Sequence, residues 1–94
     1  MENYELDKIL NYEEFKEYFN NFSYEAEIII VINGEEYMII KINNNINSVS
    51  FQKMGDQRGE IYYKSLDDLY ESETIFGICL KRDWKKISRI TNYW

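Results

Sequence analysis

The pattern of hydrophobic and polar positions in residues 26–42 predicts a β-hairpin. The segment AEIIIVINGEEYMIIKI places two runs of strand-forming residues on either side of Asn33-Gly34. A two-residue type I′ turn needs positive φ at both central positions, which Asn and Gly tolerate best. Because such a turn leaves no slack, it predicts a register with these opposed pairs: Ile32 and Glu35, Val31 and Glu36, Ile30 and Tyr37, Ile29 and Met38, Ile28 and Ile39.

Alternation along the two strands leaves neither face of the hairpin polar. One face carries Ala26, Ile28, Ile30, Ile32, Tyr37 and Ile39, and the other carries Ile29, Val31, Met38, Ile40 and Ile42. A strand that is apolar on both sides usually lies inside a sheet that is covered on each face. Either this chain covers both faces of the hairpin, or one face is an interface with another protein.

A helix is predicted to precede the hairpin. Asn11 and Glu14 have the spacing of a capping box, in which each side chain bonds the backbone N–H of the other residue. Asn20-Asn21 is the expected end. The aromatic residues that recur at helical spacing are Tyr12, Phe15, Phe19 and Phe22, and the charged residues on the rest of the helix are Glu13, Glu14, Lys16 and Glu17. Residues 1–10 fit either a helical turn or an edge strand.

Two further strands and two further helices are expected after the hairpin. Asn43-Asn44-Asn45 predicts a turn, residues 48–53 alternate like a half-exposed third strand, and residues 60–64 predict a fourth. Ser65 is a helix N-cap candidate with Asp67 and Asp68 in the first turn. The spacing of Leu80, Trp84, Ile87 and Thr91 predicts an amphipathic C-terminal helix. The expectation is one α+β domain over residues 1–94, with an antiparallel four-stranded meander in the order αββββαα.

The composition limits the chemistry that the chain can carry. It has one cysteine, Cys79, and no histidine, so neither an internal disulfide nor a zinc site is expected, and no cofactor is predicted. The first residues, MENYELDK, lack the basic and apolar pattern of a signal peptide, and no apolar run has the length of a membrane span. These features favour a soluble cytoplasmic protein without membrane contact.

No arrangement of residues predicts catalysis. Asp67 and Asp68 are adjacent carboxylates, but helix capping explains them fully. Cys79 lies in the apolar run IFGICL without a histidine base, which favours a buried inert thiol. Residues 55–59 have two glycines but lack the lysine and the strand-to-helix context of a phosphate-binding loop. We therefore expect the protein not to be an enzyme.

Two charged surfaces remain as candidate binding sites. The formal net charge is -6, with ten acidic and three basic residues in 1–47, but one acidic and five basic residues in 81–94. The acidic candidates are Glu13, Glu14, Glu17, Glu35, Glu36, Asp67, Asp68, Glu71 and Glu73. The basic candidates, on the predicted C-terminal helix, are Lys81, Arg82, Lys85, Lys86 and Arg89. The sequence leaves open whether the acidic residues share one face.

In size, acidity and an Ile-, Asn-, Lys- and Tyr-rich composition without proline, the chain resembles the small inhibitors encoded by phages and mobile elements, anti-CRISPR proteins among them. The stretches NYEEFKEYF and NGEEY carry this resemblance. It implies a protein without catalytic activity that blocks a nucleic-acid-binding groove or an assembly surface of a bacterial defence nuclease.

The sequence supports two hypotheses from different classes. The first is a small acidic protein that binds a basic, nucleic-acid-handling protein and inhibits it by steric and electrostatic blocking, as an anti-CRISPR or immunity protein would. The alternative is a nucleic-acid-binding or regulatory protein that uses the basic C-terminal segment, with aromatic residues that stack on bases. Self-association into a homodimer, through a hairpin face or an open sheet edge, is compatible with both.

Overall fold

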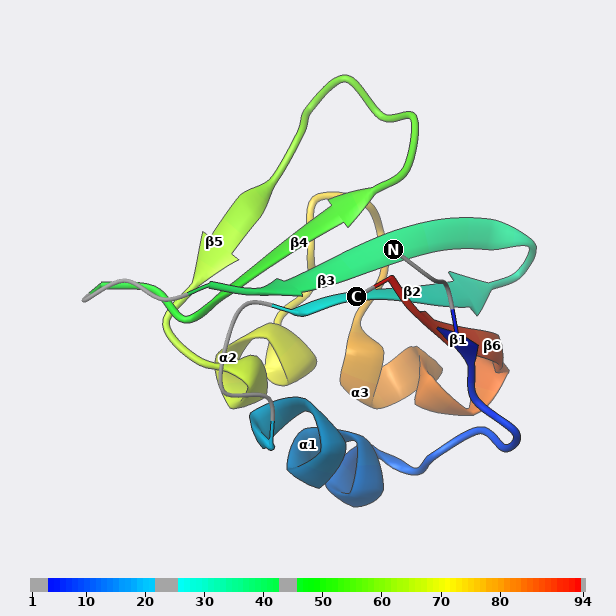
Figure 1. Cartoon of the computed structure of the whole chain (residues 1–94). Coiled ribbons are helices and arrows are strands. Elements are labelled where there is room, and N and C mark those ends of the chain that lie inside the picture. The colour runs from blue at the N-terminus through cyan, green and yellow to red at the C-terminus, as the bar shows by residue number, and fades with distance from the viewer. Residues whose placement is uncertain (1–3, 22–25, 43–45, 94) are drawn as a thin grey trace.

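The computed structural model describes residues 4–21, 26–42 and 46–93, and shows an antiparallel sheet with its helices on one face (Figure 1). In chain order the elements are β1 (Tyr4–Glu5), α1 (Tyr12–Asn20), β2 (Ala26–Ile32), β3 (Glu35–Lys41), β4 (Val49–Lys53), β5 (Ile61–Tyr63), α2 (Leu66–Glu71), α3 (Leu80–Asp83), a 3-10 helix (Trp84–Lys86) and β6 (Ile87–Asn92). The strand order is β1-β6-β2-β3-β4-β5. The α+β class and the β2-β3-β4-β5 meander are confirmed, but the sheet has six strands in place of the expected four.

The β2–β3 hairpin lies in the middle of this sheet. Asn33 and Gly34 form its turn with φ values of 52° and 79°, as the type I′ turn requires. All five predicted pairs are present, from Ile32 with Glu35 to Ile28 with Ile39. The hairpin and its register are therefore confirmed.

The capping box at the start of α1 is also confirmed. The Glu14 backbone N–H donates to the Asn11 side chain (2.8 Å), and the Asn11 N–H donates to the Glu14 carboxylate (3.0 Å). Phe15 and Phe19 are buried, and the helix ends at Asn20 as expected. The predicted continuation of the stripe to Phe22, and the turn predicted at 43–45, lie outside the described residues.

The C-terminal helix predicted through Thr91 is wrong beyond residue 86. Residues 80–86 are helical, but Ile87–Asn92 form β6, which pairs with β2 on one side and with β1 on the other. Ile87 lies opposite Ile32 and Arg89 lies opposite Val31, so Ser88 is an extra residue in the ladder. This bulge turns Ile87 and Ile90, three positions apart, to the same face, whereas Thr91, the last residue of the predicted stripe, pairs with Ile29 and lies on the opposite face.

The structure settles two smaller questions from the sequence. Of the two alternatives for the N-terminal segment, the described part contains a strand, β1, which pairs with β6. The predicted third strand is β4, but the prediction that one of its sides is exposed is partly wrong. Ser50 on that side is fully buried and its hydroxyl donates to Glu60 (2.8 Å).

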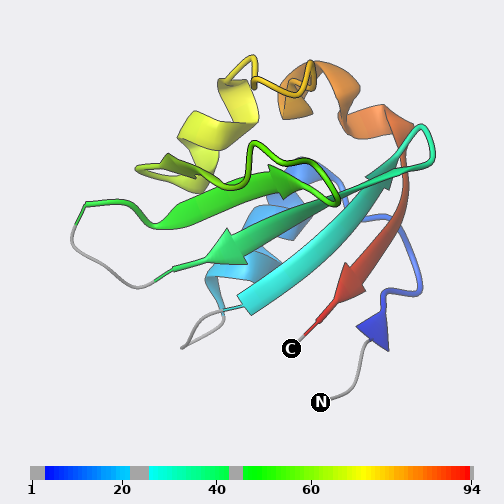
Figure 2. The same cartoon turned by 90° about the horizontal axis from the view of Figure 1, so that it is seen from above.

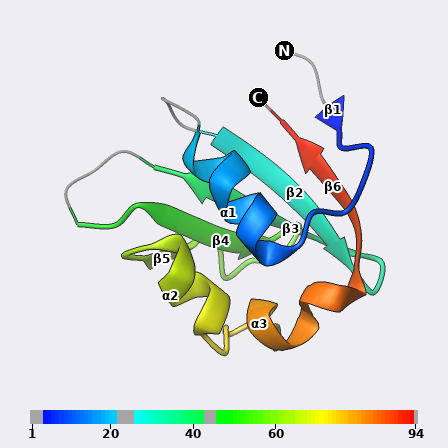
Figure 3. The same ribbon diagram turned by 90° about the horizontal axis from the view of Figure 1, so that it is seen from below.

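The helices pack on one face of the sheet and form the core there. Viewed from below, α1, α2 and α3 lie in front of the strands (Figure 3), whereas the view from above shows the opposite face of β2, β3 and β6 without a helix (Figure 2). Ile28, Ile30 and Ile39 of the hairpin are fully buried in the helix-covered core. On the opposite face Ile29 and Val31 are also buried, at 4% and 8% exposure. The proposal that a partner covers this second face stays a prediction.

Candidate protein-binding surface

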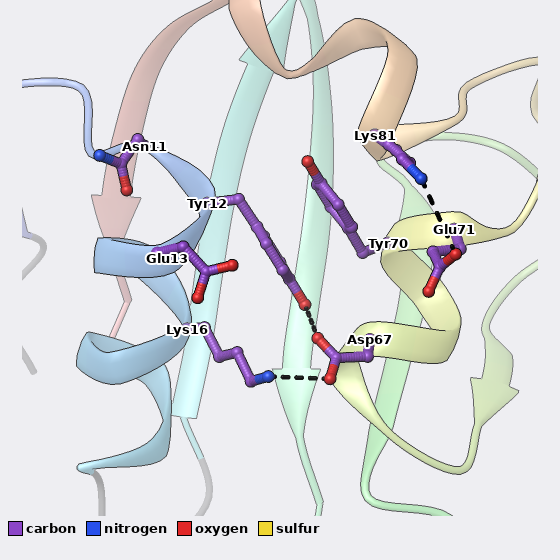
Figure 4. A pocket seen from close by; sticks show the side chains of 8 residues that line it. All are labelled: Asn11, Tyr12, Glu13, Lys16, Asp67, Tyr70, Glu71 and Lys81. Atoms are coloured by element: carbon purple, nitrogen blue, oxygen red, sulfur yellow. Dashed lines mark hydrogen bonds and ion pairs between the residues drawn. The ribbon is translucent and has the colours of Figure 1, made fainter.

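A hollow of about 410 Å³ lies between α1 and α2 (Figure 4). Its lining residues come from both helices and from the start of α3: Asn11, Tyr12, Glu13, Lys16, Asp67, Tyr70, Glu71 and Lys81. The sequence forms this hollow because the aromatic side chains of α1 turn toward the sheet, which leaves its charged positions at the rim. Charged groups therefore surround an aromatic floor.

Two stacked tyrosines make that floor, and a tryptophan packs against them. The rings of Tyr12 and Tyr70 stack with centroids 3.5 Å apart and an interplanar angle of 9°. Trp84 meets both rings edge-on, with centroids 5.4 Å from Tyr12 and 6.0 Å from Tyr70. The Trp84 indole N–H donates to the Leu10 carbonyl (2.9 Å), which ties the 3-10 helix to the start of α1. Such rigid aromatic packing fixes the relative position of the helices.

A polar clasp of Tyr12, Lys16 and Asp67 joins the two helices across the hollow. The Tyr12 hydroxyl donates to Asp67 Oδ1 (2.6 Å), and Lys16 Nζ donates to Asp67 Oδ2 (2.8 Å). The hydrogen bond from Lys16, followed by that from Tyr12, lowers the pKa of Asp67. Burial raises the pKa of the Tyr12 phenol, and the Asp67 carboxylate raises it further. Asp67 is therefore an ionised acceptor that holds α1 against α2.

Carboxylates from both helices act on the same ring. Burial is the main reason that the pKa of Tyr70 is raised, and the charges of Glu13 on α1 and Glu71 on α2 add to it. In Figure 4 the Glu13 and Glu71 side chains flank the stacked rings. Lys81 compensates Glu71 at a distance of 3.9 Å, with both side chains largely exposed. Since a pair this exposed contributes little, the negative charge at the rim stays available to a partner.

The acidic candidates divide between different parts of the molecule. Six of them lie on the helix layer: Glu13, Glu14, Glu17, Asp67, Asp68 and Glu71. We call these six residues the helix-layer acids. Glu35 and Glu36 follow the hairpin turn instead, and Glu73 pairs with Arg82 (2.6 Å). Glu36 pairs with Arg89 (3.6 Å) on the face of the sheet that carries no helix. The structure therefore places two thirds of the acidic candidates on α1 and α2, and the other third outside these two helices.

Three of the helix-layer acids have amine partners and three do not. Glu14 pairs with Lys8 (3.0 Å), Asp67 with Lys16 and Glu71 with Lys81. In the described part of the chain, Glu13, Glu17 and Asp68 have no cation within 4.0 Å. A second hollow of about 400 Å³ runs along α1, lined by Asn11, Glu13, Glu14, Lys16, Glu17 and Asn20. Three of the six helix-layer acids thus carry a negative charge that no described amine compensates.

The basic candidates do not form one face. Lys81, Arg82, Lys85 and Lys86 lie on α3 and the 3-10 helix, whereas Arg89 lies on the opposite face of the sheet. Asp83, 2% exposed, pairs with Arg82 (2.9 Å) and Lys86 (3.5 Å). Only Lys85 of the five has no ionic partner among the residues that the structure describes. The buried Asp83 therefore compensates two of the five predicted basic residues, Arg82 and Lys86.

Sequence reasoning missed the residues that connect the acids. Helical spacing predicts that Tyr12 lies on the apolar stripe of the first helix, but it gives no sign that Tyr12 stacks on Tyr70. The available signal was Lys16, the one basic residue in α1, which pairs with an anion outside its own helix. The sequence could not show that this anion is Asp67, 51 positions away.

Other features of the described residues add no chemical site. They contain no group of three or more potential metal ligands, and no helix that is long and apolar enough to cross a membrane. Comparisons with protein-family models, with curated proteins and with solved structures found no significant match to the chain.

Proposed function

We propose that this chain is a small binding protein that docks its helix-layer acids on a basic surface of a nucleic-acid-handling protein and blocks that surface. The observation that carries the proposal is the placement of six carboxylates on two packed helices, three of them without a cation in the described part of the chain. Complementary charge accelerates encounter and selects the partner, while a rigid platform avoids the entropic cost of ordering it. The anti-CRISPR-like or immunity-like role expected from the sequence is one form of this function.

The aromatic floor supports a protein partner in preference to a diffuse counterion cloud. Tyr and Trp are enriched at the centres of protein interfaces, where they present large rigid surfaces. Here Tyr70 is half-buried beside the hollow, within a rim of charge. A basic side chain entering the hollow would meet Glu13 and Glu71 at the rim and the Tyr70 ring below them.

Direct binding to nucleic acid receives less support from the geometry. Phosphate recognition needs cations that are free to replace counterions. Arg82 and Lys86 both contact the buried Asp83, and Arg89 lies on a different face from the other cations. The predicted basic helix, on which that alternative depended, ends before Arg89.

The test is a charge reversal at positions that hold no structural contact. Glu14 is unsuitable because it closes the capping box, but Glu13 and Glu17 are exposed and unpaired in the described part. The double variant Glu13→Lys/Glu17→Lys should weaken binding to a captured basic nuclease about tenfold or more, and binding of the native chain should weaken with added salt. Titration calorimetry against candidate defence nucleases measures both effects.

The matched control reverses two exposed carboxylates away from the helix layer. Glu5→Lys/Glu27→Lys makes the same change in net charge, on β1 and β2. It should weaken binding much less than the helix-layer variant. Equal losses in both variants would show that only net charge matters, and salt-independent affinity would exclude the electrostatic mechanism. A gel shift with DNA and RNA at low salt tests the alternative, and a shift abolished by Lys85→Glu/Lys86→Glu would favour it.

A further inference from the structure

The sheet ends at β5 with an open edge. In the strand order β1-β6-β2-β3-β4-β5, Ile61–Tyr63 pair with β4 on one side, and no described strand lies on the other. Figure 1 shows β5 at the margin of the sheet, beyond β4. The backbone N–H and C=O groups that point away from β4 are therefore available for pairing with another chain.

The sequence at this edge is complementary to itself. Residues 60–64 read Glu-Ile-Tyr-Tyr-Lys, with one acid and one base at equal distances from Tyr62. In an antiparallel pair centred on Tyr62, Glu60 of each copy faces Lys64 of the other, and Ile61 faces Tyr63. A centre at Ile61 or at Tyr63 would place neither charge opposite its counterpart. Charge therefore selects one register among the alternatives.

Glu60 and Tyr62 lie on the face of the sheet that carries no helix. Tyr62 pairs with Ser50 and is 52% exposed. Its hydroxyl donates to Glu60 Oε2 (3.2 Å), while Ser50 Oγ donates to Glu60 Oε1 (2.8 Å). Glu60 is thus held beside Tyr62 at the edge. Neither Glu60 nor the exposed Lys64 has an ion-pair partner in the described part of the chain, so both charges are uncompensated within one copy.

We propose that β5 is a homodimerisation edge, at which two copies pair antiparallel about a two-fold axis through Tyr62. The interface is isologous, because the same five residues of each copy contact each other and the two Glu60–Lys64 pairs are equivalent. It extends the six-stranded sheet into one of twelve strands. Since three paired residues bury far less area than a standard interface, the dimer dissociates readily and forms at concentrations of about 0.1–1 mM.

Sedimentation equilibrium of the full chain, from about 20 µM to about 2 mM, tests the proposal across that range. The mean mass should rise from one chain toward two. Glu60→Lys and Lys64→Glu should each raise the dissociation constant about tenfold, because each puts like charges opposite each other at two places. An equimolar mixture of these two variants should associate again, since each contact between unlike copies then joins a Lys to a Glu. The double variant Glu60→Lys/Lys64→Glu should also recover dimerisation.

The controls separate this edge from the helix layer and from folding. Glu13→Lys/Glu17→Lys changes the helix-layer acids and should leave the dimer unaffected, so this inference and the proposed function fail independently. Circular dichroism verifies that each variant is folded. A chain that stays monomeric throughout the range, a dimer insensitive to both single reversals, or a mixture that does not associate would each overturn the proposal.

Discussion

The Tyr12 hydroxyl offers the most direct test of the clasp between α1 and α2. Tyr12→Phe removes one oxygen atom but keeps the ring that stacks on Tyr70 and meets Trp84. It deletes the 2.6 Å hydrogen bond to Asp67 while the ion pair of Asp67 with Lys16 remains. The variant therefore isolates a single hydrogen bond to an ionised acceptor.

The magnitude follows from the surroundings of the two groups. Tyr12 is 8% exposed, so its hydroxyl has little access to water, but the Asp67 side chain is 50% exposed and can regain solvent. A hydrogen bond to a charged partner contributes about 1.5–3 kcal/mol, and the exposure of Asp67 places this one at the lower end. The free energy of unfolding should thus fall by about 1.5 kcal/mol, which lowers the midpoint of urea unfolding by about 1 M.

Urea unfolding, followed by circular dichroism, measures this loss and its pH dependence. The pKa of Asp67 is lowered in the folded protein, so its contribution is complete above the ordinary carboxyl pKa of about 4 and is lost as the pH falls through the folded value. The gap in stability between Tyr12→Phe and the native chain should therefore narrow below about pH 4.

The matched control is Tyr63→Phe. Tyr63 is half-buried against the core, and its hydroxyl has no hydrogen-bond partner among the described residues. The free energy of unfolding of this control should fall by less than about 0.5 kcal/mol. Equal losses of unfolding free energy in Tyr12→Phe and Tyr63→Phe would show that the clasp does not stabilise the fold. A difference between Tyr12→Phe and the native chain that stayed constant as Asp67 became protonated would show the same.

Two further predictions concern local structure. Asn11→Ala should lower the free energy of unfolding by about 1 kcal/mol, measured by urea unfolding, because the Glu14 backbone N–H loses its cap, while Asn11→Ser should retain most of the stability. Asp83→Asn should cost about 2 kcal/mol near neutral pH, because it weakens the contacts with Arg82 and Lys86. The hydrogen bond from Arg82 helps to lower the pKa of Asp83 to about 2, so the native chain should lose this contribution between about pH 4 and pH 2, and the variant should not. An unchanged acid dependence in Asp83→Asn would contradict this assignment.

The sequence predicted those elements that are determined by a few neighbouring residues. The Asn33-Gly34 turn determined the register of the hairpin, and Asn11 with Glu14 determined the start of α1. Both depend on backbone dihedrals or hydrogen bonds among neighbours, so distant contacts do not override them. Ser65 belongs to the same class, because its hydroxyl accepts from the Asp68 N–H as expected.

The C-terminal strand escaped prediction because a bulge altered its period. A regular strand directs every second residue inward, but the extra residue Ser88 lets Ile87 and Ile90 face the core together. Only the pairing with β2, about 60 positions earlier, determines that residues 87–92 form a strand and not a helix. The same limit applies to the candidate binding surface. The sequence contains the acidic residues, but only the packing of α1 beside α2 shows that Glu13, Asp67 and Glu71 line one hollow.

The position of β6 also protects the most aggregation-prone segment of the chain. Six of the seven residues in β2 are apolar, and five of these are Ile or Val, a composition that favours intermolecular β-pairing when an edge is exposed. With β3 on one side and β6 on the other, β2 has no free edge. Because β6 comes from residues 87–92, a nascent or truncated chain that ends before them presents β2 as an uncapped template. Proteolysis or a frameshift that removes this short segment would then leave β2 free to pair with other copies and to form insoluble assemblies.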